Sequence, residues 1–139
     1  MKHKKEETKL SYLIAEYLEL QYPDIIFRFD IASNLKMTIG QAKLIKDKFK
    51  HKRGFPDLTI FQPSTDGFHG LFLELKKDRN SLYKKNGQLR KNKHILEQLE
   101  VIKKMNSLGY YANFSCGFDE TKMIIDIYLK GHMKHWIEE

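Results

Sequence analysis

The chain has 139 residues, a formal net charge of +7 and one cysteine. This length suits one domain with a single core, and the lone cysteine excludes an internal disulfide and a cysteine-based zinc site. No apolar stretch is long enough to span a bilayer, and the charged start is not followed by the apolar region of a signal peptide. We therefore expect one cytoplasmic domain, over residues 1–139, with no membrane partner.

The first predicted elements are a helix, a strand and a basic segment. Apolar residues at helical spacing predict a helix over residues 6–21, which Pro23 ends. Residues 25–30 are predicted to form the first strand. Residues 31–54 are irregular and basic, and a short helix is expected over residues 40–50.

Two short strands joined by a turn come next. Residues 57–62 and 70–77 each carry an apolar run. The stretch between them contains Pro63, Asp66 and Gly67, which are typical turn residues. Two such runs around a turn predict an antiparallel hairpin.

The rest of the chain adds one strand between two helices. Residues 78–92 are polar and predict a mobile loop. A helix is expected over residues 93–108, ended by a glycine suited to the left-handed conformation. A fourth strand over residues 110–116 follows, and Asp119 is a candidate cap for a last helix that ends near residue 129.

This order of elements indicates an α/β domain. The crossover from the third strand through a helix to the fourth is long enough for parallel pairing. We expect a small mixed sheet flanked by helices, which is a three-layer core. The domain then comprises an N-terminal helix (residues 1–24), the core (25–129) and a tail (130–139) whose structure the sequence does not predict.

The hairpin is expected to bring two acids and a lysine together. With the loop centred between residues 65 and 66, Asp57 lies directly opposite Glu74, with Cβ atoms roughly 5 Å apart. Period-two alternation puts Lys76 on the same face as Glu74. Two buried carboxylates repel unless one is protonated, whereas with Mg²⁺ they form an ordinary site of hard oxygen ligands. The alternative is that Asp57 is a turn residue and that the other two form an exposed edge pair.

Two further side chains are candidates for this site. Gln98 lies in the middle of the apolar face of the predicted helix at residues 93–108, and a core-facing glutamine needs hydrogen-bond partners. Those partners are either the sheet backbone or groups beside the metal, and both alternatives stay open. On the first helix, Glu6 and Glu7 face the core side. Either of them is a further candidate carboxylate for the metal, the alternative being a solvated helix start.

Positive charge is concentrated on both sides of this acidic centre in the sequence. Residues 36–53 hold seven Lys or Arg and one acid, and residues 76–93 hold eight and one. A basic rim around a small acidic spot suits a polyanion such as nucleic acid, whereas charge runs are otherwise solvated surface. The candidate contacts to phosphates are Lys43, Lys46, Lys50, Lys52, Arg53, Lys77, Arg79, Lys84, Lys85 and Arg90.

These residues resemble the PD-(D/E)xK nuclease superfamily, and within it the VRR-Nuc domains. Glu7 stands at the place of the family's early acid. The resemblance covers most of the chain from about residue 54 to 129. It is carried by Gly54-Phe55-Pro56-Asp57-Leu58, Gly70-Leu71-Phe72-Leu73-Glu74-Leu75-Lys76, Glu97-Gln98, Leu108-Gly109-Tyr110-Tyr111-Ala112 and Gly117-Phe118-Asp119.

The resemblance implies a restriction-endonuclease-like core and DNA phosphodiester cleavage that depends on Mg²⁺, with Mn²⁺ able to substitute. It implies that Asp57, Glu74 and the backbone carbonyl of Leu75 bind the metal, with Glu7 as a further metal contact. Lys76 then orients or deprotonates the attacking water, and Gln98 positions the lysine or the water.

The resemblance is to the compact stand-alone type of phages and bacteria, which is similar to junction resolvases and tends to dimerise. It therefore implies a homodimer in a bacterial or phage-infected cell, selective for branched or junction DNA and not for a base sequence. The alternatives are a catalytically silent DNA-binding module on the same fold and an RNA-directed nuclease.

Overall fold

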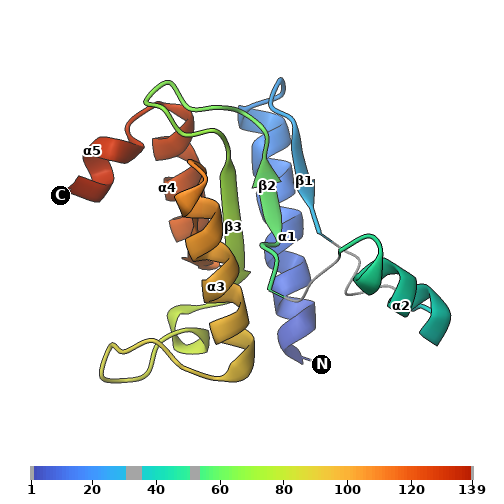
Figure 1. Ribbon diagram of the computed structural model, residues 1–139. Coiled ribbons are helices and arrows are strands. Elements are labelled where there is room, and N and C mark those ends of the chain that lie inside the picture. The colour runs from blue at the N-terminus through green and yellow to red at the C-terminus, as the bar shows by residue number, and fades with distance from the viewer. Residues whose placement is uncertain (1, 31–35, 51–53, 139) are drawn as a thin grey trace.

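A four-stranded sheet between helices forms the centre of the molecule (Figure 1). The computed structural model describes residues 2–30, 36–50 and 54–138. The elements are, in chain order, α1 (Lys2–Gln21), β1 (Phe27–Phe29), α2 (Ile39–Asp47), β2 (Leu58–Ile60), β3 (Leu71–Lys76), the short 3-10 helix η2 (Arg79–Ser81), α3 (Lys93–Ser107), β4 (Tyr111–Cys116), α4 (Gly117–Leu129) and α5 (Met133–Glu138).

The sheet is mixed, with the strands in the order β1-β2-β3-β4. β1, β2 and β3 pair antiparallel, and β3 pairs with β4 in parallel. α3 is the crossover between the two parallel strands, as a parallel pair requires. The small mixed sheet and the hairpin predicted from the sequence are therefore confirmed.

Apolar side chains alternate between the two faces of the sheet along each strand, and they form two cores, one on each side of the sheet. Leu71 and Leu73 of β3 pack with α1 and α4 in the larger core. Phe72, between them in sequence, packs on the other side with Ile95 and Ile102 of α3. Since successive strand residues face opposite ways, this pattern gives the expected α/β architecture of helix, sheet and helix layers.

The start of α4 differs from its prediction. The helix begins at Gly117 with Cys116 as its N-cap residue, and the Cys116 side chain makes no capping hydrogen bond. The Cys116 backbone N–H instead donates to the Glu120 carboxylate. Asp119 is therefore not the cap, and the prediction that it begins the helix is wrong. It lies in the first turn, where an acid is favoured by the helix dipole.

Residues 78–92 are mainly loop, as predicted, but they contain a 3-10 helix and one isolated bridge. The mobility of this loop stays a prediction. The Asp78 carboxylate accepts a hydrogen bond from a backbone N–H of η2 and caps it. Leu82 is 1% exposed and belongs to the core beside α3. Tyr83 and Leu89 then pair as a β-bridge, which closes the segment on itself.

Two helices lie at the periphery. α2 begins with a capping box at Thr38 and Gln41 and has no buried residue, and it stands apart from the body of the molecule in Figure 1. α5 forms in the tail that the sequence left unassigned, and it packs through the fully buried Met133. Among the described residues, none of the helices is both long enough and apolar enough to cross a membrane.

Candidate functional site

The register of the hairpin places Asp57 opposite Glu74. β2 and β3 are antiparallel, with Leu58 opposite Leu73, so the next pair toward this end of the sheet is Asp57 and Glu74. The backbone N–H of Leu75 also donates to Asp57 Oδ2 at 2.9 Å. This is the register expected from the sequence, and opposed residues of antiparallel strands share a face.

Gly54 sets the approach of the Asp57 loop to α3. Its φ is +89°, and a Cβ at this position would lie 2.8 Å from the backbone carbonyl oxygen of Glu97 and 3.0 Å from the backbone nitrogen of Gln98. Glycine is the residue that tolerates both the positive φ and the close contact. The loop before Asp57 therefore packs directly against the turn of α3 that carries Gln98.

Gln98 connects the acid to the lysine. Its side chain is 2% exposed, its Oε1 accepts a hydrogen bond from Lys76 Nζ at 2.9 Å, and its Nε2 donates to Glu74 Oε1 at 2.7 Å. An ammonium only donates and a carboxylate only accepts, so the two partners fix the orientation of the amide. Of the two alternatives left open by the sequence, the partners of Gln98 are these charged groups and not the sheet backbone.

Burial raises the pKa of both carboxyl groups, those of Glu74 and Asp57. Glu74 is 5% exposed, and its neighbour Lys76 is 6% exposed. Burial, and then the negative charge of Asp57, raises the pKa of Glu74 well above its usual value, although the Lys76 charge opposes this. Burial also raises the pKa of Asp57, against the lowering effect of the Leu75 N–H. Like charges held this close favour retention of a proton between them.

The oxygen atoms of this pair fit a divalent cation. Glu74 Oε2 is buried and has no hydrogen-bond partner among the described residues. Two carboxylates completed by water and phosphate oxygens are a usual coordination for Mg²⁺. Within the part of the chain that the structure describes, no group of three or more His, Cys, Asp or Glu side chains is arranged to hold a metal. A metal site formed by Asp57 and Glu74 stays a prediction.

The two candidate acids at the start of α1 differ in their neighbours. Glu7 is near enough to Glu74 for its charge to raise the pKa of that group further. Glu6 instead forms an ion pair with Lys77, with 3.2 Å between Oε2 and Nζ. Glu7 is therefore the acid of α1 that acts on the site electrostatically.

Two residues beside the site, Asp30 and His94, were not predicted from the sequence. β1 pairs with β2 so that Asp30 follows in the same row as Asp57, and its N–H donates to the Asp57 carbonyl at 2.8 Å. His94 lies one helical turn before Gln98, with 2.9 Å between the two Nε2 atoms. The i, i+4 spacing on α3 was the available signal for His94, and only the strand pairing reveals Asp30.

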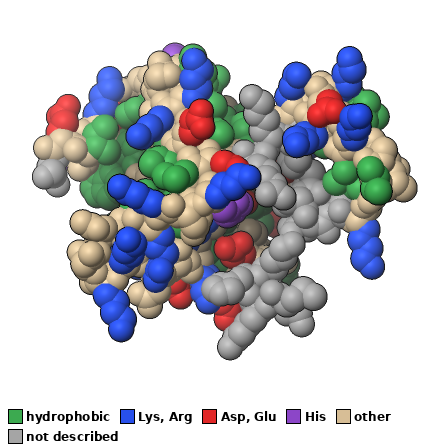
Figure 2. Space-filling view, turned by 60° about the horizontal axis from the view of Figure 1, so that its bottom comes forward, with side chains coloured by type: hydrophobic (Ala, Val, Ile, Leu, Met, Phe, Trp, Pro, Cys, Tyr) green, Lys and Arg blue, Asp and Glu red, His purple; other side chains and the backbone are tan. Residues whose placement is uncertain are grey.

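Many of the basic residues predicted to contact phosphates are exposed. Figure 2 shows the lower end of Figure 1, where Lys and Arg side chains are spread around the margin and a histidine and acidic side chains lie nearer the middle. Lys43 and Lys46 are exposed on α2, Lys50 follows that helix, and Lys84 and Lys85 are exposed in the segment after β3. Lys52 and Arg53 lie outside the described residues.

Three other predicted basic residues have protein partners. Lys77 pairs with Glu6. Arg79 lies 3.4 Å from Glu120 and stacks over the Tyr83 ring at 4.6 Å. Arg90 Nε donates to a backbone carbonyl of η2 at 2.8 Å. These three side chains hold the segment after β3 in place.

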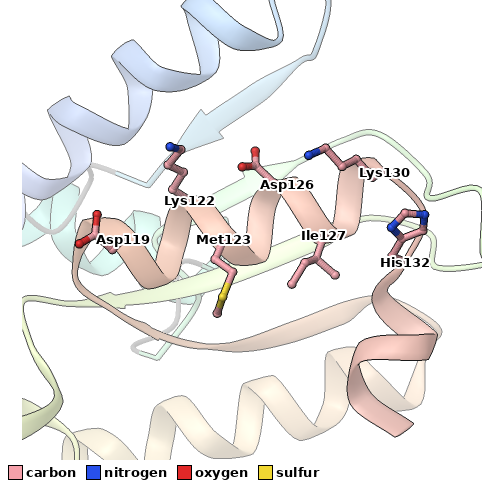
Figure 3. Close-up of a pocket in the computed structure, with 7 residues that line it drawn as sticks. All are labelled: Asp119, Lys122, Met123, Asp126, Ile127, Lys130 and His132. Carbon is pink, nitrogen blue, oxygen red and sulfur yellow. The ribbon is translucent and has the colours of Figure 1, made fainter. Parts of the chain in front are cut away.

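A separate hollow of about 500 Å³ lies along the outer side of α4 (Figure 3). Lys122, Asp126 and Lys130 line one side of it, and Met123 and Ile127 line another. None of the four predicted catalytic side chains lines this hollow. It is therefore not part of the candidate site.

Comparison with known proteins supports the fold. No family model matches the chain, and no curated protein matches it significantly. A solved structure described as a VRR_NUC domain protein superimposes with a TM-score of 0.59 and 21% sequence identity, over 89% of this chain and 88% of that chain. Similarity at this identity shows a shared fold, and function has to be argued from the site. The resemblance drawn from the sequence is confirmed at the level of architecture: the chain has the fold of a VRR_NUC domain protein, a four-stranded mixed sheet flanked by helices.

Proposed function

We propose that this chain is a nuclease that hydrolyses phosphodiester bonds in DNA with the help of a divalent metal. The observation that supports this is the buried chain of contacts from Lys76 through Gln98 to Glu74, with Asp57 beside it. Burying two acids and an ammonium costs desolvation free energy, which a purely structural role does not require. Such a cluster in a fold shared with a VRR_NUC domain protein is typical of a functional site.

In this proposal Asp57 and Glu74 hold the metal, with the backbone carbonyl of Leu75 and with Glu7 as a further contact. Mg²⁺ or Mn²⁺ bound there supplies positive charge next to the scissile phosphate and lowers the pKa of a water molecule. Lys76 orients or deprotonates the attacking water, or stabilises charge on the phosphate. Gln98 acts through Lys76, because the bond to its Oε1 fixes the direction of the ammonium.

The exposed lysines suit a substrate recognised by its backbone. Lys43 and Lys46 on α2 and Lys84 and Lys85 after β3 are placed to contact phosphates, which gives affinity without base specificity. Because contacts to phosphates do not read the bases, we propose that the protein selects DNA by its structure, with branched or junction DNA as the preferred substrate.

The first prediction is that Asp57→Ala or Glu74→Ala abolishes cleavage and leaves DNA binding largely intact. Purified protein is incubated with linear duplex, flap and four-way-junction DNA in Mg²⁺ or Mn²⁺. We expect the cleavage rate of each variant to fall by at least about a hundredfold, while the Kd measured in EDTA changes by less than about threefold. Glu100→Ala, on the outer side of α3, is the matched control and should cleave normally.

Two further measurements separate this proposal from its rivals. Lys76→Ala should lose cleavage but retain metal binding in a calorimetric titration with Mn²⁺, because the two carboxylates remain. Undiminished cleavage by both acid variants would refute the proposal. A protein that binds DNA but takes up no Mn²⁺ would be a silent binding module, and cleavage of RNA in place of DNA would assign a different substrate.

A further inference from the structure

A second candidate binding surface lies on the same side of the sheet as the site. α3 packs over β4 and Phe72 of β3 on this side, and a groove of about 390 Å³ lies toward β1 and β2. We call it the aromatic groove. Four phenylalanines and two cations line it: Phe49, Phe55, Phe61, Phe72, Arg28 and Lys50.

Strand pairing places this groove next to the predicted catalytic acids. Arg28 is opposite Thr59, and Thr59 is opposite Phe72, so the three side chains form one row across the sheet. Asp57 and Glu74 form the next row on the same face, two residues further along each strand, which is roughly 7 Å. The groove and the site therefore adjoin without any intervening element.

Three of the four phenylalanines are exposed to solvent. Phe49, Phe61 and Phe55 are 70%, 56% and 42% exposed. Phe55 also packs edge-on against Phe72, with ring centroids 5.8 Å apart, which holds one aromatic platform in a fixed orientation. Exposed apolar side chains gathered in one place mark a binding surface more often than scattered ones do.

The charges of the groove narrow the choice of ligand. Arg28 and Lys50 line it with one acid, Asp30, and α2 beside it carries further exposed lysines, Lys43 and Lys46. An apolar protein segment covering the groove would desolvate its cations without providing partners for them, which is unfavourable. A polyanion with flat apolar rings satisfies both the cations and the phenylalanines.

We propose that the aromatic groove binds unpaired nucleotides of the nucleic-acid substrate and leads that strand to Asp57 and Glu74. In a duplex the faces of the bases are already stacked on one another, whereas an unpaired base has a free face for an aromatic side chain. This inference deepens the proposed nuclease function and rests on it for its purpose. It would account for a preference for flap DNA, whose single-stranded arm is unpaired, over continuous duplex.

The test measures binding without cleavage. Fluorescence anisotropy in EDTA gives the Kd of a labelled oligo(dT) of about 12 nucleotides and of a duplex of the same length. Removal of one stacking platform weakens single-strand binding by about 5- to 150-fold. We therefore expect Phe49→Ala with Phe61→Ala to weaken oligo(dT) binding at least tenfold and to change duplex binding by less than about twofold. Tyr12→Ala, which removes a 62% exposed aromatic from α1, is the matched control and should change neither Kd.

A spectroscopic signal tests stacking directly. Trp136 is the single tryptophan of the chain, so Phe61→Trp combined with Trp136→Phe places the only indole in the groove. Oligo(dT), and equally oligo(rU), should quench this indole, and the duplex should not. The pair Phe49→Leu with Phe61→Leu keeps apolar bulk but loses the aromatic faces, so it should behave like the alanine pair.

Three outcomes would overturn the inference. The first is an unchanged oligo(dT) Kd for the alanine pair. The second is an equal loss of single-strand and duplex binding. The third is a lower molecular mass of the alanine pair than of the wild type in analytical ultracentrifugation, which would make the groove a contact between two copies of the chain. Cleavage of linear duplex is measured in parallel. If cleavage occurs but oligo(dT) binding does not depend on the rings, the inference fails and the proposed nuclease function stands. If oligo(dT) binding depends on the rings but no cleavage occurs, the groove binds single strands and the proposed nuclease function fails.

Discussion

Gly54 illustrates how one backbone position supports the whole candidate site. Its positive φ and its contact with the α3 backbone at Glu97 and Gln98 leave no room for a Cβ. Helix backbone cannot move aside as the end of a flexible side chain can. The separation between the Asp57 loop and Gln98 therefore depends on the absence of a side chain at position 54.

The second prediction is that Gly54→Ala lowers both stability and cleavage. We expect the free energy of unfolding in urea to fall by at least about 3 kcal/mol, because positive φ and a backbone clash combine, and cleavage to fall because Asp57 moves. Gly87→Ala is the matched control: φ is +84° there, but nothing lies within 4 Å of the added Cβ. Gly87→Ala should lower the free energy of unfolding by only about 1–2 kcal/mol and leave cleavage unchanged. Equal costs for the two variants would contradict the packing argument.

The third prediction is that Glu74→Gln stabilises the protein when no metal is present. Burial and Asp57 raise the pKa of Glu74 in the folded state, so its ionised form at neutral pH disfavours folding, and a neutral amide removes that cost. We expect the Tm in EDTA to rise by about 2–5 °C and the further rise caused by Mn²⁺ in the wild type to disappear. The exposed Glu100→Gln should leave both values unchanged. A lower Tm in EDTA for Glu74→Gln would show that its charge is already compensated.

At this scale the sequence predicted the relations within the hairpin better than those between elements. The register that sets Asp57 opposite Glu74 follows from turn residues and period-two alternation, which are local. The choice between two kinds of partner for Gln98 depended on how α3 lies across the sheet, and no local pattern specifies that. Asp30 was missed for the same reason, since only the pairing of β1 with β2 brings it beside Asp57.

At the scale of elements, partly buried hydrogen bonds join α1 and the residue after it to α4. Asp126 Oδ1 accepts hydrogen bonds from the hydroxyl groups of both Tyr17 and Tyr22. Burial, and then the bond to Asp126, raises the pKa of Tyr22 to about 12, so this hydroxyl remains a donor throughout the physiological range. One carboxylate thus ties Tyr17 of α1, and Tyr22 directly after that helix, to the helix that covers the same face of the sheet.

The fourth prediction is that Asp126→Ala destabilises the fold by about 2–3 kcal/mol, because two hydroxyl groups lose a charged acceptor. Urea unfolding measures this change. Glu16→Ala is the matched control, since it removes a bond of the same type from the exposed Tyr12, at 2.9 Å, and should cost less than about 0.5 kcal/mol. Equal costs would mean that Asp126 contributes no more than a surface contact.

The elements that the sequence missed had weak local signals. α4 begins without a capping side chain at Cys116, so the nearest acid in the sequence was mistaken for the cap. Residues 78–92 contain three apolar residues, Leu82, Tyr83 and Leu89, which are too few to set a period from which an element can be predicted. The burial of Leu82 against α3 is a tertiary effect. The hairpin, α3 and β4 were predicted because each combines periodicity with a turn or cap residue at its boundary.

At the scale of the whole molecule, the charge of +7 predicts binding that depends on salt. Exposed lysines lie on two separate parts of the chain, α2 and the segment after β3. Each phosphate neutralised by the protein releases counterions, so the logarithm of affinity falls with the logarithm of salt concentration in proportion to the number of contacts.

The fifth prediction concerns the slope of that dependence. Lys84→Ala with Lys85→Ala should reduce the slope by about 1–2 units, since each lost phosphate contact contributes about 0.9. Lys103→Ala with Lys104→Ala, on the exposed side of α3, removes the same charge and should leave the slope nearly unchanged. The Kd is measured over a series of salt concentrations in EDTA. Equal slopes for the two variants would show that net charge, and not placement, controls binding.

The dependence of the site on α3 also bears on how the protein is made. The ribosome releases the hairpin with Asp57, Glu74 and Lys76 before it releases the helix that carries Gln98. Until that helix docks, the ammonium lacks the amide that directs it, and the Asp57 loop lacks the backbone against which it rests. Under the proposed function, a nascent chain therefore has the two acids before it has the geometry of the site, and we expect cleavage only after α3 has docked.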